Sequence, residues 1–182
     1  MPNRSRALLA MASLAPAAAL GAPTPDHGFV PGVGAGGVRL GMSEGEVLKV
    51  LGRPAARRRV RTDLGSFVEM TWPGISVRRW DGAGGRVIGI AVTDRGIRMA
   101  NGIGVGSCLA RVRSAFPRAA CEPSPAVCVL GDPVPGNTVT TLRFGRSRCV
   151  TEVGVDRVIA ERRGRPREPN RTGGEPGAAD AR

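Results

Sequence analysis

The sequence predicts an α+β protein built from two tandem αβββ repeats, each a short helix packed on a small antiparallel sheet. Two segments carry the signals of short amphipathic helices, and apolar residues alternate with a period of two after each of them. The two halves also align at an offset of 65 residues, which places Leu40-Gly41-Met42 on Val105-Gly106-Ser107 and Val47 on Val112. A repeated unit accounts for all three observations.

The first repeat is expected over residues 37–100. Ser43 and Glu46 have the spacing of a capping box, and Gly52 ends the helix that they begin. The helix is followed by a three-stranded meander with turns between its strands. The residues that alternate along these strands are Val68, Met70 and Trp72, then Ile75 and Val77, then Ile88, Ile90 and Val92.

The second repeat is expected over residues 101–160. Ser107 can cap its helix, and Pro117 stops it. A second meander follows, in which the alternating apolar residues are Val127 and Val129, then Leu142 and Phe144, then Val153 and Val155.

Residues 1–21 have the composition of an export signal, with Arg4 and Arg6 before an apolar run that is too short to cross a bilayer as a helix. A flexible lead-in is expected over residues 22–36, and a disordered tail over residues 161–182. We therefore expect a secreted or periplasmic protein without a transmembrane segment.

The four cysteines all lie in the second half, and an even number in an exported chain indicates two disulfides. Cys149 has the same parity as the core-facing Val153, so we expect it to meet Cys108 at the start of the helix. Cys121 and Cys128 then pair across a turn or neighbouring strands. A zinc site is disfavoured, because no C-x-x-C spacing occurs and the only histidine lies in the lead-in.

The chain is strongly basic, with a formal net charge of +12, and all but one of its 27 basic residues are arginine. A positive field attracts acidic protein faces and anionic polymers, and it weakens with salt. The near absence of lysine is equally consistent with a codon bias toward arginine.

The candidate binding surface combines arginine with tryptophan on the predicted strands of the first repeat. Trp80 has the parity of Arg78 rather than that of the apolar residues, so it is expected beside guanidinium groups, a pairing typical of interaction hot spots. The alternative is an ordinary solvated strand face. The candidate residues are Arg57, Arg58, Arg59, Arg61, Trp72, Arg78, Arg79 and Trp80.

Catalytic chemistry is weakly represented. The only histidine, His27, lies in the lead-in, so a Ser-His or Cys-His device is not expected. Asp94 and Asp156 end corresponding predicted strands, where aspartate is usually a turn former. No metal, cofactor or nucleotide site is predicted.

Gly41-Met42-Ser43, followed by Glu46-Val47, resembles the G-M-[ST]-x-x-[EQ]-V motif of two envelope families. These are the small outer-membrane assembly lipoproteins of the BamE/SmpA type and the secreted β-lactamase inhibitory proteins. The resemblance implies a tandem helix-plus-sheet protein whose sheet faces form a concave binding surface.

The sequence thus favours a non-enzymatic protein-binding module that acts through its sheet surface on another secreted or envelope protein. Nucleic acid is not an expected partner. The first alternative is adhesion of the arginine-rich surface to anionic envelope polymers or a membrane surface. The second is a small hydrolase, which requires a pocket with convergent polar groups near the two aspartates or the serines.

Overall fold

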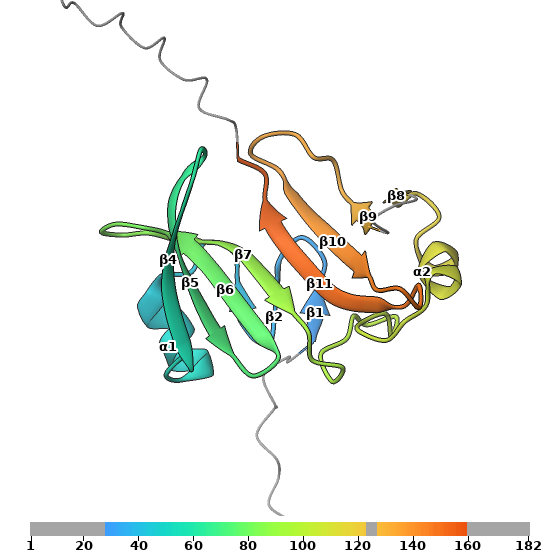
Figure 1. Cartoon of the computed structure of the whole chain (residues 1–182), viewed down its shortest axis with the longest axis horizontal. Helices are drawn as coiled ribbons and strands as arrows, with labels where there is room; N and C mark the ends of the chain where they lie inside the picture. The colour runs from blue at the N-terminus through green and yellow to red at the C-terminus, as the bar shows by residue number, and fades with distance from the viewer. Residues whose placement is uncertain (1–27, 123–126, 160–182) are drawn as a thin grey trace, which may run out of the picture.

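A computed structural model describes residues 28–122 and 127–159, which form mainly β-structure (Figure 1). Eight strands form one antiparallel sheet in the order β4-β5-β6-β7-β11-β10-β9-β8, and three short strands form a second sheet in the order β1-β2-β3. The expected signal peptide over 1–21 and the expected tail over 161–182 lie outside the described residues, as does His27.

Each of the two described helices precedes four strands of the large sheet. In chain order the elements are β1 (Phe29–Val30), β2 (Gly34–Ala35), β3 (Val38–Arg39), α1 (Glu44–Leu51), β4 (Ala56–Thr62), β5 (Gly65–Trp72), β6 (Ile75–Trp80), β7 (Val87–Val92), α2 (Leu109–Ala115), β8 (Ala120–Cys121), β9 (Val127–Leu130), β10 (Thr138–Phe144) and β11 (Val150–Arg157).

The expected fold class, two αβββ repeats with separate small sheets, is wrong. Strand β7 pairs with β11 in antiparallel register, from Val92 opposite Val153 to Gly89 opposite Asp156. This pairing merges the strands of both halves into one sheet. Alternation along a strand shows which residues share a face, but it does not show which strand lies alongside.

Strand β4 is also absent from the expected fold. Its seven residues read Ala-Arg-Arg-Arg-Val-Arg-Thr, and all except the fifth are exposed. A strand with both faces in solvent has no buried set of residues, so it lacks the alternation that reveals the other strands.

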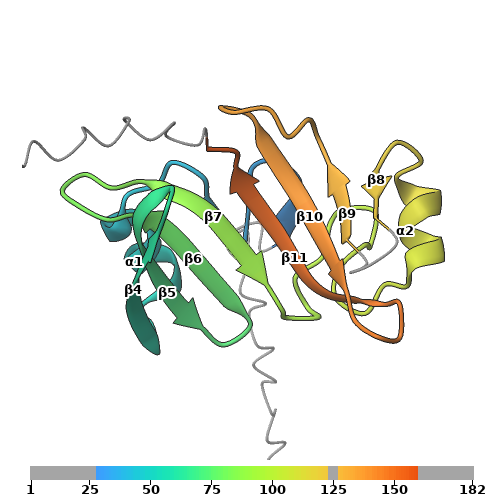
Figure 2. The same ribbon diagram turned by 45° about the horizontal axis from the view of Figure 1, so that its top comes forward.

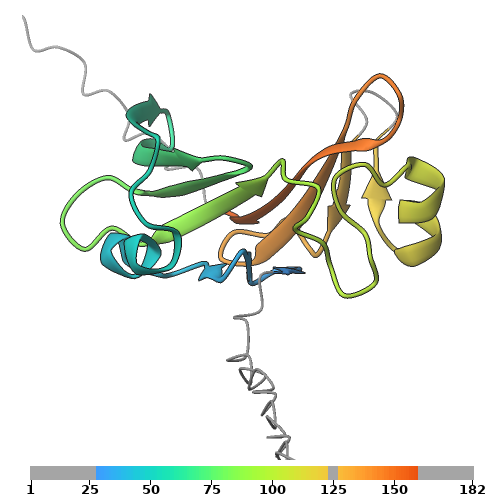
Figure 3. The same ribbon diagram turned by 90° about the horizontal axis from the view of Figure 1, so that it is seen from below.

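The two faces of the large sheet differ. One face carries the main core, which is closed by Val38 of β3, Val47 of α1 and Val112 of α2, all fully buried. Figure 3 shows α1 and β1–β3 on this side of the sheet, whereas the ends of the sheet bend upward on the other side. The second side is hereafter called the open face. The sheet residues of the core include Val68, Met70, Val77, Ile90, Val92, Leu142, Val153 and Val155.

Residues 28–36, expected to belong to a flexible lead-in, instead form β1 and β2 against the core face. Phe29 is buried, and the Gly32 N–H donates a hydrogen bond to Thr140 Oγ1 of β10 at 2.9 Å. Two-residue strands are too short to produce a hydrophobic period, so the sequence pattern does not reveal them.

The predicted capping box of α1 is confirmed. The Ser43 N–H donates to Glu46 Oε2 at 2.7 Å, and the Glu46 N–H donates to Ser43 Oγ at 3.4 Å. The second helix differs from expectation, because its N-cap is Cys108, whose side chain makes no capping bond. The Ser107 hydroxyl instead accepts a hydrogen bond from the Gly104 N–H at 3.1 Å, within the preceding turn.

A β-bulge changes the face on which Ile88 lies. Arg78 is opposite Gly89 and Arg79 is opposite Val87, so Ile88 is an extra residue in β7. It is buried, but it lies outside the main core cluster. The expectation that it shares a face with the core residues that follow it is therefore wrong.

Both expected disulfides are present. Cys108–Cys149 joins the start of α2 to the residue before β11, and Cys121–Cys128 joins β8 to β9. No described cysteine remains free.

The two disulfides should differ in their contribution to stability. They span sequence separations of 41 and 7 residues, and a cross-link that closes a longer loop removes more entropy from the unfolded chain. We expect a loss of about 4 kcal/mol in the Cys108→Ser/Cys149→Ser variant and about 2 kcal/mol in the Cys121→Ser/Cys128→Ser variant. Urea unfolding of both variants measures the difference, and a reversed order would contradict this loop-entropy account.

Candidate functional site

A row of charged residues crosses the open face perpendicular to the strands. The register of six adjacent strands places one residue of each strand in this row. Four of these residues are charged, and positive and negative side chains alternate along the row. The members are Arg58, Glu69, Arg78, Gly89, Asp156 and Val139, from β4, β5, β6, β7, β11 and β10 respectively.

Beside this row the open face is hollowed, and one part of the hollow is apolar. Five apolar residues line this part: Leu64, Phe67, Trp80, Ile88 and Ile159. The hollow has a volume of about 290 Å³, enough for one or two side chains of a partner. Its lining includes residues of β5, β6, β7, β10 and β11, and Figure 2 shows how these strands are arranged.

The other part of the hollow is charged. Arg78 donates a hydrogen bond to Asp156, and its guanidinium carbon lies 6.0 Å from the centroid of the Phe67 ring. Arg143 Nε donates to Glu152 Oε1 at 3.0 Å. Arg78 therefore connects the apolar part, through a cation–π contact, to the carboxylate of the charged part.

Gly89 makes room for the ion pair between Arg78 and Asp156. A Cβ atom at position 89 would lie 2.2 Å from Asp156 Oδ1 and 3.0 Å from an Arg78 guanidinium nitrogen. The two side chains thus meet directly over the backbone of β7. Glycine in a strand interior often marks such a close approach.

The environment of Asp156 raises the pKa of its carboxyl above the ordinary value near 3.8. Partial burial is the main cause, because it disfavours the charged form. The charge and hydrogen bond of Arg78, and to a lesser extent the charge of Arg143, act in the opposite direction. Asp156 is therefore a partly desolvated carboxyl on an otherwise solvent-facing sheet surface.

Of the six candidate arginines, Arg58 and Arg78 lie in the row on the open face. Arg57 and Arg59 are opposite the core residues Met70 and Val68, so they project toward the helix side. The fifth member, Arg79, is 8% exposed and its guanidinium lies 2.6 Å from Glu44 of α1.

Arg57 and Arg59 also have carboxylate partners. Arg57 contacts Glu44 at 2.5 Å, and Arg59 contacts Asp81 at 2.7 Å. The sixth candidate, Arg61, is exposed and has no ion-pair partner among the described residues.

The two tryptophans occupy different sides of the sheet. Trp80 is half-buried in the hollow, on the same face as Arg78, as its parity predicts. Trp72 is 7% exposed, belongs to the main core, and donates a hydrogen bond from Nε1 to the Gly52 carbonyl at 3.2 Å. Trp72 thus contributes to packing beneath α1 rather than to the open face.

Several residues of the hollow are absent from the sequence-based site, and Asp156 is the main one. It lies near a strand end as expected, as the second-last residue of β11, but it pairs with Arg78 instead of forming a turn. Asp94 does form a turn, because its Oδ1 accepts a hydrogen bond from the Gly96 N–H at 2.7 Å. The available signal for the hollow is Gly89, a glycine in the middle of an apolar strand.

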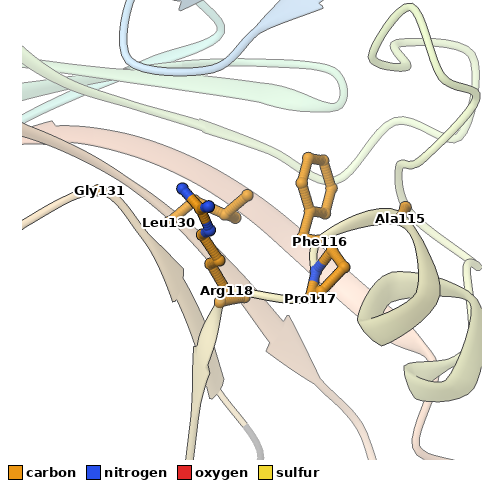
Figure 4. A pocket seen from close by; sticks show the side chains of 7 residues that line it. Ala115, Phe116, Pro117, Arg118, Leu130 and Gly131 are labelled. Atoms are coloured by element: carbon orange, nitrogen blue, oxygen red, sulfur yellow. The ribbon is translucent and has the colours of Figure 1, made fainter.

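A second hollow lies between the end of α2 and β9. Figure 4 shows Phe116, Pro117, Arg118 and Leu130 around it. Phe116 and Leu130 also pack against the main core, so this hollow belongs to the helix side of the sheet. Its lining contains no carboxyl, hydroxyl or thiol group.

The comparisons with known proteins identify no family. No family profile and no curated protein matches the chain. A crystal structure of an extracellular SCP-domain protein from Bacillus anthracis is similar with a TM-score of 0.45 and 11% sequence identity, covering 65% of this chain. This chain spans less than half of that protein, 44% of its length.

The two disulfides are compatible with a secreted protein, because such bonds persist in oxidising compartments. Neither described helix has the length and apolar composition that a membrane crossing requires. Over residues 28–122 and 127–159, no group of three or more His, Cys, Asp or Glu residues is placed to hold a metal ion.

Substitution of Gly89 by alanine should disrupt the ion pair on the open face. The added methyl group would collide with the Asp156 carboxylate, so we expect a loss of about 1–3 kcal/mol in unfolding free energy. Gly45→Ala is the matched control, because open space surrounds that helical position and alanine is the better helix former. Equal stability of the two variants in urea unfolding would contradict this role of Gly89.

Asp156 and Glu46 should affect the pH dependence of stability with opposite sign. The pKa of Asp156 is raised, so its contribution is present below about 3.8 and is lost as pH rises through the folded-state pKa. The pKa of Glu46 is lowered, chiefly by the hydrogen bond from the Ser43 N–H and then by the Ser43 hydroxyl. Its contribution is present above about 4.5 and is lost as pH falls through the folded-state pKa.

This difference is measured by urea unfolding of the wild type, Asp156→Asn and Glu46→Gln between about pH 3 and pH 7. The stability of the wild type relative to Asp156→Asn should fall as pH rises, whereas its stability relative to Glu46→Gln should increase. Slopes of the same sign would show that the environment of one carboxyl is misassigned.

Proposed function

We propose that this chain is a secreted or periplasmic, non-enzymatic protein that binds another secreted or envelope protein through the open face of its large sheet. The observation that carries the proposal is the hollow on that face. There Phe67 and Trp80 lie beside the paired Arg78 and Asp156.

The composition of the hollow supports recognition of a protein. Binding energy in protein interfaces is concentrated in tryptophan, tyrosine and arginine residues that sit in pockets and lose water on association. Trp80 is half-buried before any partner arrives, so a partner can cover it at a small cost in side-chain entropy. A partner side chain that enters the hollow would also remove water from the Arg78–Asp156 pair. This loss of water is tolerated only when the partner matches the pair in shape and charge, so the pair favours a specific partner.

The resemblance of Gly41-Met42-Ser43 and Glu46-Val47 to the assembly lipoproteins and the β-lactamase inhibitory proteins stays a hypothesis. It is in keeping with a sheet surface that binds protein, but no contact residue of either family transfers to this chain. The proposal rests on the hollow and not on the motif, since the motif residues serve the capping of α1.

Adhesion to an anionic polymer is the first alternative. It depends on net positive charge alone, and carboxylates of the same chain partly neutralise five of the six candidate arginines. A polymer interaction should also decay steeply with salt, because it depends on the release of counterions.

Hydrolysis is the second alternative, and the open face does supply a carboxyl with a raised pKa. However, Asp156 is the one acidic group in the lining of the hollow, and that lining contains no hydroxyl, thiol, imidazole or amine group. The neighbouring Glu152 accepts a hydrogen bond from Arg143, as Asp156 does from Arg78, so arginines hold both carboxyls. Acid–base or nucleophilic catalysis needs such groups to be available to a substrate. The site therefore fits recognition better than catalysis.

The proposal is tested by capture of partners from the culture's own secreted and envelope fractions with the purified chain as bait. Trp80→Ala should weaken capture by about 30-fold, the effect of a hot spot worth about 2 kcal/mol. Phe116→Ala, an aromatic truncation on the helix side, should leave capture unchanged.

The same capture, repeated over a salt series with Arg57, Arg58, Arg59 and Arg61 changed to glutamine, separates the alternatives. Capture that survives physiological salt and the glutamine changes supports a shaped protein interface. Loss of capture in the glutamine variant, with Trp80→Ala unaffected, would contradict the proposal and place binding on the arginines of β4 instead of the hollow.

A further inference from the structure

Strand β4 forms one end of the eight-stranded sheet and pairs on one side only. Its seven residues run in unbroken register with β5, from Ala56 opposite Thr71 to Thr62 opposite Gly65. Its other edge pairs with no strand in the described part of the chain. That edge therefore presents a row of backbone donors and acceptors to which a further strand could bind.

Proteins protect such an edge by shortening it, twisting it with a bulge, placing proline in it, covering it or charging it. Strand β4 has seven residues, no bulge and no proline. Charge is thus the remaining protection, and charge is selective. Like charges opposite each other on paired strands are destabilising, so arginines repel a second copy of β4, but they attract a strand that carries carboxylates.

The charge accessible at this edge is positive even though the arginines have carboxylate partners. The side chains of Arg57, Arg58 and Arg59 are 52%, 74% and 61% exposed, whereas their partners Glu44, Glu69 and Asp81 are 24%, 19% and 19% exposed. An incoming acidic group would therefore meet the arginine side chains first, because their carboxylate partners are less exposed.

Two of these three guanidinium groups keep both terminal nitrogens, whereas Arg57 donates to Glu44 through both of its own. Arg58 and Arg59 contact their partners through Nε, which leaves the two terminal nitrogens of each fork for another carboxylate. Exposed ion pairs of this kind are weak because water screens them, so they do not lock the side chains against a second acceptor.

A cleft lies beside the beginning of β4, between this strand and α1. Its volume is about 580 Å³, and its lining includes Leu48, Pro54, Arg53 and Arg57. Glu44 also lines it, but the Glu44 carboxylate is bound by Arg57 and Arg79. A strand added to the free edge of β4 would pass this cleft, which offers apolar contacts and the guanidinium group of Arg53 to its side chains.

We propose that the free edge of β4 binds an extended acidic segment of a partner protein by strand addition. Backbone hydrogen bonds would supply affinity, and carboxylates on alternate residues would contact Arg57, Arg59 and Arg61. This surface is separate from the hollow on the open face, and the inference does not depend on what the hollow binds.

The probe is a peptide of about seven residues that alternates threonine with glutamate, and its counterpart has lysine in place of glutamate. We expect the glutamate peptide to bind the intact chain at low salt about tenfold more tightly than the lysine peptide, because its cross-strand charge pairs with the arginines are attractive whereas those of the lysine peptide are repulsive. Absence of this preference would overturn the proposal.

Backbone pairing is read out by hydrogen exchange. Alternate amides of residues 56–62, those that point away from β5, should gain protection when the glutamate peptide binds, because they become hydrogen-bonded. Binding without such protection would overturn strand addition, since it would show contact with the side chains only.

Charge reversal gives the matched control. The Arg59→Glu/Arg61→Glu variant should reverse the preference toward the lysine peptide, while Trp80→Ala should bind the glutamate peptide like the wild type. If Trp80→Ala alone loses the peptide, the peptide binds the hollow and the edge proposal fails. If the charge-reversed variant is not folded by circular dichroism, Arg61→Glu alone provides the test, with a decrease in glutamate-peptide binding expected.

Discussion

The pairing of β7 with β11 is the interaction on which the rest of the structure depends. It joins strands from the two halves of the chain, with Val92 opposite Val153 and Gly89 opposite Asp156. On one face this register continues the apolar core from β7 into β11. On the other face it brings Asp156 within reach of Arg78, which lies 78 residues earlier in the sequence. Without this pairing the two halves would have separate sheets, and neither the hollow nor its ion pair would form.

The central strands meet different requirements on their two faces, and glycine is the means by which they do so. In β7, Ile90 and Val92 fill the core, while Gly89 leaves space for two charged side chains on the open face. Glycine in a strand lowers stability because it adds no packing and increases the entropy of the unfolded chain. At this position glycine leaves room for an ion pair that no larger residue would allow, and such a local compromise is characteristic of sites that serve more than folding.

The sequence predicted the features whose causes are local. The capping box of α1 depends on residues three apart and agrees with the structure. The Cys108–Cys149 disulfide is present too, but the parity argument for it is wrong, because a bulge at Thr151 places Val150 rather than Cys149 on the core face with Val153. Features that depend on the neighbour of a strand were not predictable in this way. The β7–β11 pairing, the bulge that displaces Ile88 and the pairing of Asp156 with Arg78 all require knowledge of the register between segments distant in sequence. Strand β4 was not predicted for another reason: a strand with both faces in solvent has no hydrophobic pattern.

The two surfaces also use arginine differently, although the sequence presents all the arginines as one basic excess. In the hollow, Arg78 is tied to Asp156 and stacked near Phe67, so its charge is largely compensated and its planar group acts as part of a shaped wall. Along β4, the guanidinium groups lie outside their carboxylate partners and keep unused donors. Salt screens exposed charges far more than partly buried pairs. Interactions at the edge should therefore weaken as ionic strength increases, whereas interactions in the hollow should persist. The net charge of the chain thus does not describe the behaviour of either surface by itself.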